Sequence, residues 1–119
     1  MLRKFIAPKS STDDELRDLC SEKLGCEACK IEAGPQEEII TPTSPPIGTV
    51  AVIINISKQG GALKVHRTSD NSWGNVFIGM IGSDDDEENI RSLVIVPWDA
   101  GWYYRSLGDI KLQYVIKGR

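Results

Sequence analysis

From Gly48 to the C-terminus, short runs of β-branched and aromatic residues alternate with turn residues, and this alternation restricts the fold more than any other feature. The strongest example is residues 93–104, in which four apolar residues end at Pro97, the turn residues Ala100 and Gly101 follow, and an aromatic segment begins at Trp102. Proline suits a strand boundary because it has no N–H to donate to a neighbouring strand. We therefore predict two strands joined in a hairpin-like unit.

The remaining strands follow from the same signals. Residues 49–57 are apolar on both faces as far as Ile54, which predicts a central strand that is covered on both sides. Gln59, Gly60 and Gly61 predict a turn, so residues 62–68 are expected to return as the second strand of an antiparallel hairpin. Residues 76–81 predict a third strand, and residues 110–117 alternate as a half-buried strand does. About six strands without a crossover helix predict a mainly β fold, a small antiparallel β-sandwich or barrel.

Residues 1–46 are interpreted as an N-terminal arm that precedes an antiparallel β domain at residues 47–119. Residues 1–10 are expected to be irregular. A helix is predicted at residues 12–24, because Thr12 and Glu15 match a capping box, Leu16 and Cys20 begin an apolar stripe, and Gly25 suits the position after the last turn. Two short strands are predicted at residues 30–32 and 38–41. Residues 41–46, which contain three prolines, predict an extended linker.

Length and charge narrow the function classes. The 119 residues suffice for one domain, and the first 46 carry six basic and nine acidic residues, the whole of the net charge of −3. The basic residues of the β domain are scattered, which argues against a nucleic-acid partner. No stretch has the length of a membrane span, and the N-terminus lacks the apolar core of a signal peptide. We expect synthesis in the cytoplasm and leave the final location open, a virion included.

The three cysteines all lie in the arm, and Cys26 and Cys29 form a C-x-x-C motif. Together with His66, the one histidine, Cys20, Cys26 and Cys29 have the ligand types of a Cys₃His zinc site. A second C-x-x-C pair is missing, so we favour three reduced thiols, with Cys20 packed beneath the helix, and predict no cofactor. His66 shares a strand face with Lys64 and Thr68, which predicts exposure to solvent.

The acidic run at residues 84–88 suggests a calcium site, with Asp84, Asp85 and Asp86 as oxygen ligands. It lacks the spacing and the internal glycine of an EF-hand loop. We favour a solvated loop whose charge discourages aggregation of the neighbouring strands. No nucleophile motif or phosphate-binding glycine loop is found, so we assign no catalytic residue and predict that the chain is not an enzyme.

The aromatic cluster is the candidate binding surface, for which we select Trp98, Asp99, Trp102, Tyr103, Tyr104, Arg105 and Trp73. Trp102 and Tyr104 share one face of a strand, and Tyr103 and Arg105 share the other. Exposed tryptophan and tyrosine beside acid and base suit a protein interface or a sugar ring. The alternative is that these aromatics belong to the core; we leave core and surface open for Trp98 and favour the core for Trp102.

Three functions follow from these features. The first is a non-enzymatic structural or assembly subunit, a homo-oligomer or a protein that docks on a partner through its β domain and its arm. The second is a carbohydrate-binding module that uses the aromatic patch. The third, an enzyme, has the least support. We favour the first.

Overall fold

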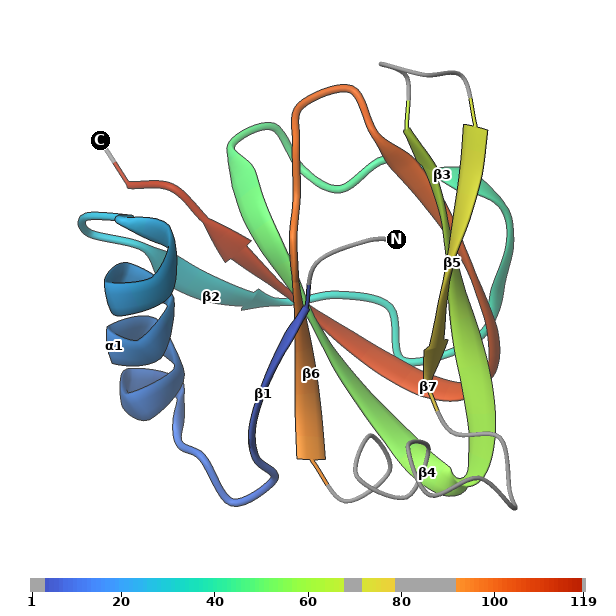
Figure 1. The fold of residues 1–119 in the computed structure, drawn as a ribbon, viewed down its shortest axis with the longest axis horizontal. Helices are drawn as coiled ribbons and strands as arrows, with labels where there is room; N and C mark the ends of the chain where they lie inside the picture. The colour runs from blue at the N-terminus through green and yellow to red at the C-terminus, as the bar shows by residue number, and fades with distance from the viewer. Residues whose placement is uncertain (1–3, 68–71, 79–91, 119) are drawn as a thin grey trace.

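The computed structural model of the chain describes residues 4–67, 72–78 and 92–118. In these ranges the elements are β1 (Phe5–Pro8), α1 (Asp13–Leu24), β2 (Lys30–Ala33), β3 (Ile39–Thr43), β4 (Thr49–Arg67), β5 (Ser72–Ile78), β6 (Ser92–Pro97) and β7 (Tyr103–Ile116). Every strand pair in these ranges is antiparallel, and the strands fold into two layers with open edges (Figure 1). The mainly β prediction is confirmed in its sandwich form.

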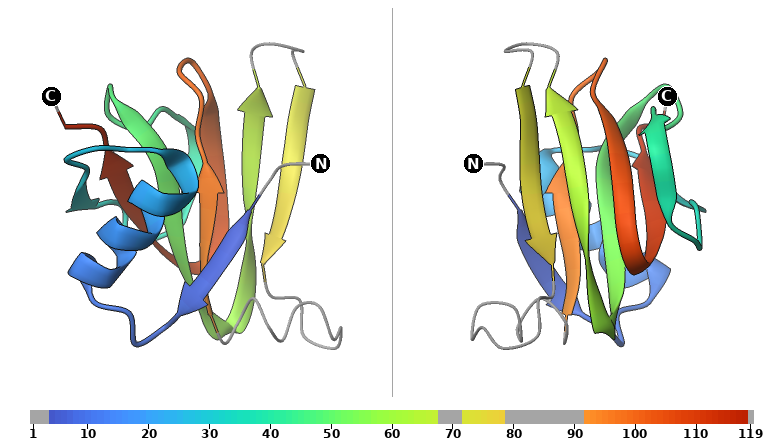
Figure 2. Two further views of the ribbon diagram at one scale, coloured as in Figure 1. Left: turned by 60° about the vertical axis from the view of Figure 1, so that its left-hand side comes forward. Right: turned by 90° about the vertical axis from the view of Figure 1, so that its right-hand side faces the viewer.

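The two long strands β4 and β7 belong to both layers. Their pairing runs from Thr49 opposite Ile116 to His66 opposite Tyr103, with an irregularity between Ile56 and Gly61. Before the irregularity β4 also pairs with β6, and after it β4 also pairs with β5. The first layer therefore has the order β1-β6-β4-β7-β2, and the second has the order β5-β4-β7-β3 (Figure 2).

The hairpin predicted around Gly60 is wrong. Residues 49–67 form one strand of 19 residues, because both halves pair with the same partner, β7. Between Ile56 and Gly61 the four residues 57–60 lie opposite the single residue 109 of β7, so the glycines accompany a bend in the sheet and the chain does not reverse there.

The hairpin-like unit predicted at residues 93–104 is also wrong. Pro97 ends β6 as expected, but β4 lies between β6 and β7 in the sheet. The connection from Trp98 to Trp102 instead carries the chain from the first layer to the second (Figure 2). The backbone N–H of Trp98 donates to the carbonyl of Val50 at 2.9 Å, which fixes the start of this crossing.

The first 46 residues contribute three strands to the layers. The expectation of an irregular start is wrong, because β1 pairs with β6, Phe5 opposite Ile95. The short strands β2 and β3 are confirmed, and both pair with β7. Residues 41–43 of the predicted linker lie in β3, where Pro42 is tolerated because only β7 pairs with this strand among the described residues. The division of the chain at residue 46 stays a prediction.

Helix α1 confirms the sequence signals. The Thr12 hydroxyl accepts from the N–H of Glu15 at 3.2 Å, and the Glu15 carboxylate accepts from the N–H of Thr12 at 2.9 Å. These bonds, the backbone bond first, lower the pKa of Glu15. Gly25 ends the helix at φ 66°, a conformation that glycine adopts without a steric penalty. No helix within the described ranges is long and apolar enough to cross a bilayer.

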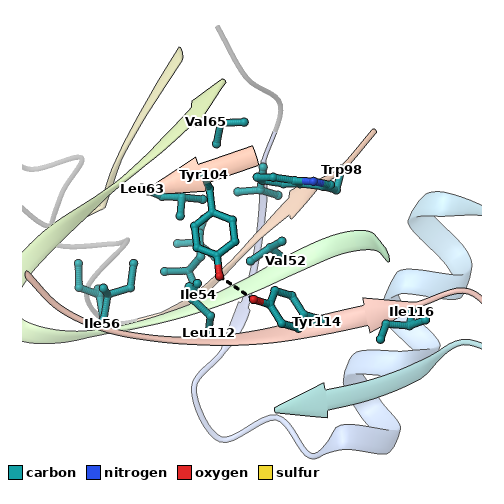
Figure 3. Packing of buried hydrophobic residues seen from close by; sticks show 13 residues of the cluster. Val52, Ile54, Ile56, Leu63, Val65, Trp98, Tyr104, Leu112, Tyr114 and Ile116 are labelled. Atoms are coloured by element: carbon teal, nitrogen blue, oxygen red, sulfur yellow. Dashed lines mark hydrogen bonds between the residues drawn. The ribbon is translucent and has the colours of Figure 1, made fainter. Parts of the chain in front are cut away.

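Two apolar clusters lie on opposite faces of the first layer. The inter-sheet core fills the space between the layers (Figure 3) and consists of Val52, Ile54, Ile56, Leu63, Val65, Val94, Val96, Trp98, Tyr104, Ile110, Leu112, Tyr114 and Ile116. The helix-side core lies beneath α1 and consists of Ala7, Leu16, Cys20, Cys26, Cys29, Ala51, Ile53, Leu93, Ile95 and Val115. Alternate residues of β4 enter each core, which confirms that residues 49–54 form a strand covered on both sides.

Because α1 packs on the first layer through Leu16, which is 2 % exposed, we expect the arm and the sheet to unfold together. Leu16→Ala should lower the free energy of unfolding by about 2–5 kcal/mol, since it leaves a cavity in the helix-side core. The measurement is urea unfolding followed by tryptophan fluorescence, because all three tryptophans lie outside the arm.

The matched control is Glu22→Ala, which changes an exposed residue of the same helix and should leave the midpoint nearly unchanged. If Leu16→Ala shifts only the helical circular dichroism and not the tryptophan transition, the arm unfolds independently and the common unit is rejected.

Candidate functional site

The structure distributes the predicted aromatic surface over three environments. Trp98 and Tyr104 lie in the inter-sheet core, 7 % and 0 % exposed. Trp102 is partly buried and packs against that core, which agrees in part with the core interpretation, and Asp99 is exposed. Tyr103 and Arg105 are partly buried on the other face of β7. The predicted residues therefore do not form one surface.

The side chain of Trp73 lies outside the described part of the structure, which gives the β5 backbone at this position. Its Cα lies opposite that of His66 in the β4–β5 pairing.

Three of the predicted aromatics contact one another edge to face. The ring centroids of Trp98 and Trp102 are 5.7 Å apart with an interplanar angle of 70°, and those of Trp98 and Tyr104 are 6.0 Å apart at 83°. Such pairs add about 0.5–1.5 kcal/mol beyond the area that they bury. Trp98 therefore joins the core to Trp102 at the surface, and the connection between β6 and β7 is fixed by its own aromatic side chains.

Trp102 and Asp99 line a groove of about 480 Å³ between two loops. One wall is the β6–β7 connection, residues 98–102, and the other is the β3–β4 connection, residues 44–48, with Lys117 beside it. The two loops lie at the same end of the molecule (Figures 1 and 2). We call this feature the loop groove.

Ile47 is the most exposed large apolar side chain among the described residues, at 102 %. Its loop is held by several bonds: the hydroxyl and the N–H of Thr49 both donate to the Pro46 carbonyl, at 2.7 and 3.2 Å, and the N–H of Lys117 donates to the Gly48 carbonyl at 2.8 Å. Gly48 adopts φ 92°, which favours glycine, and two prolines restrict the preceding backbone. The loop therefore presents Ile47 outward in a defined conformation.

The two walls of the groove carry opposite charges. Asp99 is exposed on one wall and Lys117 is exposed on the other. The ion pairs recorded in the described part of the chain join Arg17 to Asp14 and Lys30 to Glu32, so neither groove charge is neutralised by such a pair.

Residues of one wall of this groove were predicted from the sequence, and those of the other wall were not. Trp98, Asp99 and Trp102 were found from their residue types. Ile47 was missed because it lies at the predicted boundary between the linker and the β domain, and Lys117 was counted only among the scattered basic residues of the β domain. The available signal was an isoleucine between proline and glycine, an apolar residue that no strand would bury.

The outer face of the second layer contains the remaining predicted residues. His66 stacks on Tyr103, with centroids 4.5 Å apart and an interplanar angle of 18°, and Lys64 lies opposite Arg105 in the pairing. The prediction that His66 is exposed is wrong, since its exposed fraction is 7 %. The cause is tertiary: β7 places an aromatic ring directly across the strand pair.

The hydroxyls of Tyr104 and Tyr114 form a hydrogen bond of 2.6 Å inside the inter-sheet core (Figure 3). These tyrosines come from opposite halves of β7, so the bond joins the two layers. Burial, with a smaller contribution from the bond to Tyr114, raises the pKa of Tyr104. Burial also raises the pKa of Tyr114, against the opposing effect of its bond to Tyr104.

The cysteines differ from the prediction of three reduced thiols. Cys26 and Cys29 form a disulfide with a Cα–Cα distance of 5.9 Å, and only Cys20 is free. The backbone bends back between them, with Ala28 at φ 53°. Cys20 is buried in the helix-side core as expected, and burial raises the pKa of its thiol to about 11.

The candidate zinc site is not supported by the described residues. His66 lies in the second layer, whereas all three cysteines lie in the helix-side core, so the Cys₃His set is not brought together. Within the described ranges no three histidine, cysteine, aspartate or glutamate residues are grouped as metal ligands. Asp84, Asp85 and Asp86, and with them the predicted acidic loop, lie outside the described residues.

Comparison of the chain with protein-family models, with curated proteins and with solved structures finds no match.

The bond between the layers gives a test of the core. Tyr104→Phe leaves the buried hydroxyl of Tyr114 without this partner and should lower the free energy of unfolding by about 1–3 kcal/mol. The double variant Tyr104→Phe/Tyr114→Phe removes both hydroxyls and should lose less than the sum of the single variants. Urea unfolding of the four proteins measures the coupling, and strict additivity would contradict a bond between these hydroxyls.

The buried thiol predicts a dependence on alkaline pH. Between pH 9 and about 11 the unfolded chain has lost the Cys20 proton while the folded chain keeps it. The contribution of this thiol to stability is therefore complete below pH 9, and the free energy of unfolding should decrease across this window. Cys20→Ala should make the decrease less steep, although the substitution also weakens packing. Equal slopes for the two proteins would reject a raised pKa for this thiol. Tyr104 and Tyr114 act in the same direction at higher pH in both proteins.

Proposed function

We propose that this chain is a non-enzymatic assembly subunit that docks on a protein surface, a second copy or another protein, through the loop groove of its β domain. The observation that carries the proposal is Ile47, held fully exposed beside a groove that contains Trp102. A component of a virion or of a surface structure is one setting in which such a subunit functions.

The groove is lined by several apolar residues. A single exposed apolar residue is common on protein surfaces, but Ile47 lines the same groove as Pro45, Pro46 and Trp102. Full burial of an isoleucine side chain contributes about 1.5–3 kcal/mol. Because the loop is already held by Thr49 and Lys117, little conformational freedom is lost when it docks. These features favour a protein interface.

The N-terminal arm has a smaller role in this proposal than its sequence suggested. Leu16 and Cys20 of α1 are already buried against the sheet of their own chain. Exchange of the helix between copies would first have to expose these side chains to water. We therefore place the docking surface on the loop groove and assign α1 to the stability of the subunit.

Carbohydrate binding is the second candidate, supported by Trp102 and the exposed Asp99 on one wall. The burial of Trp98 removes one of the rings that a sugar would stack on, so this candidate ranks below protein docking. A glycan that shifts the tryptophan fluorescence of the native chain but not that of Trp102→Ala would reverse the order.

Ile47→Asp should weaken self-association or partner binding at least about tenfold, because it places a charge where an apolar side chain is buried. Sedimentation equilibrium from micromolar to millimolar concentration measures the association. At a concentration where the native chain is monomeric the unfolding midpoint should not change, since the residue is fully exposed. The control is Ile40→Asp, at an exposed isoleucine of β3 that does not line the groove, and it should associate as the native chain does.

The proposal is contradicted if Ile47→Asp and Ile40→Asp behave alike in every association that the native chain forms.

A further inference from the structure

We propose that the occupant of the loop groove is a second copy of this chain, related by a two-fold axis, so that Ile47 of each copy enters the groove of the other. This inference rests on the proposed docking function and adds the identity of the partner and the geometry of the contact.

Each wall of the groove pairs one apolar anchor with one charge. On the first wall Ile47 lies close to Lys117, because the backbone N–H of Lys117 is bonded to Gly48, the next residue after Ile47. On the second wall Trp102 lies close to Asp99, because the N–H of Trp102 donates to the Asp99 carbonyl at 3.3 Å in the turn. The two walls therefore carry opposite charges and both contain an apolar anchor.

A two-fold axis makes this arrangement complementary to itself. In an isologous dimer each contact occurs twice, residue i on residue j and residue j on residue i. When the two-fold axis runs along the groove, between the two copies, the wall with Ile47 and Lys117 faces the wall with Trp102 and Asp99 of the other copy. Isoleucine then meets tryptophan, and lysine meets aspartate, at both ends of the contact.

The charges also argue against partners of uniform charge. A strongly acidic surface would be repelled by Asp99, and a strongly basic surface by Lys117. Neither charge is neutralised by an ion pair within the described part of its own chain. A second copy supplies the missing acid and the missing base at once, together with an apolar side chain that the aromatic wall can cover.

Charge reversal tests the two-fold contact on the full chain. Asp99→Lys alone and Lys117→Asp alone should each raise the dimer dissociation constant at least about tenfold, because like charges then meet twice. The double variant Asp99→Lys/Lys117→Asp restores opposite charges at both ends and should return to within about threefold of the native value. Sedimentation equilibrium measures the constants, and unchanged unfolding midpoints at a concentration where the native chain is monomeric show that every variant is folded.

Two outcomes of these measurements overturn the inference. A native chain that stays monomeric to millimolar concentration excludes the dimer. If Ile47→Asp weakens the native dimer but the double variant Asp99→Lys/Lys117→Asp does not regain the native dissociation constant, the proposed docking function stands and this geometry is rejected.

A photocrosslinker separates the inference from docking on another protein. Benzoylphenylalanine is placed at Ala100, an exposed residue of the groove wall, in the purified full chain and in the chain within its source cells. The expected product is a covalent dimer whose crosslink maps to residues 44–50 or 117 of the other copy. Crosslinks to a different protein, without a covalent dimer, overturn the inference and keep the docking function. The same crosslinker at Ile40 is the control and should give no dimer.

Discussion

The antiparallel pairing of β4 with β7 is the interaction on which the rest of the molecule depends. Every other described strand pairs with one of these two or, in the case of β1, with a strand that does. The irregularity between Ile56 and Gly61 folds the pair on itself, so the same two strands form the centre of both layers. The bond between Tyr104 and Tyr114 then closes β7 across the inter-sheet core (Figure 3).

The loop groove is a consequence of this folding. Because β6 belongs only to the first layer while β7 begins in the second, the chain must cross between the layers at residues 98–102. Trp98 anchors the crossing in the core, and Trp102 and Asp99 follow it at the surface. The loop that leads into β4 lies beside the crossing, with Ile47 at its most exposed position. The groove is therefore built where β4 begins and where β7 begins and ends.

Local signals predicted local structure well. Thr12, Glu15 and Gly25 placed the ends of α1, because capping bonds involve residues within one turn. The apolar residues on both faces of residues 49–54 predicted a covered strand, and two cores do cover it. Pairing was predicted less well. Gly60 and Gly61 suggested a turn, and only the presence of β7 along both halves of β4 shows that the strand continues. The disulfide between Cys26 and Cys29 was missed for a similar reason, since a spacing does not reveal the backbone conformation at Ala28.

The sequence by itself determined the β class, the capped helix and the residue types that are available for binding, because these follow from periodicity and from bonds between near neighbours. The tertiary structure decided which of those residues are accessible. It placed Trp98 and Tyr104 in the core, covered His66 with Tyr103, and brought Ile47 and Lys117 beside Trp102. The physical reason is that exposure and proximity depend on which strands pair across long sequence separations, and the composition of a strand constrains its partner only weakly.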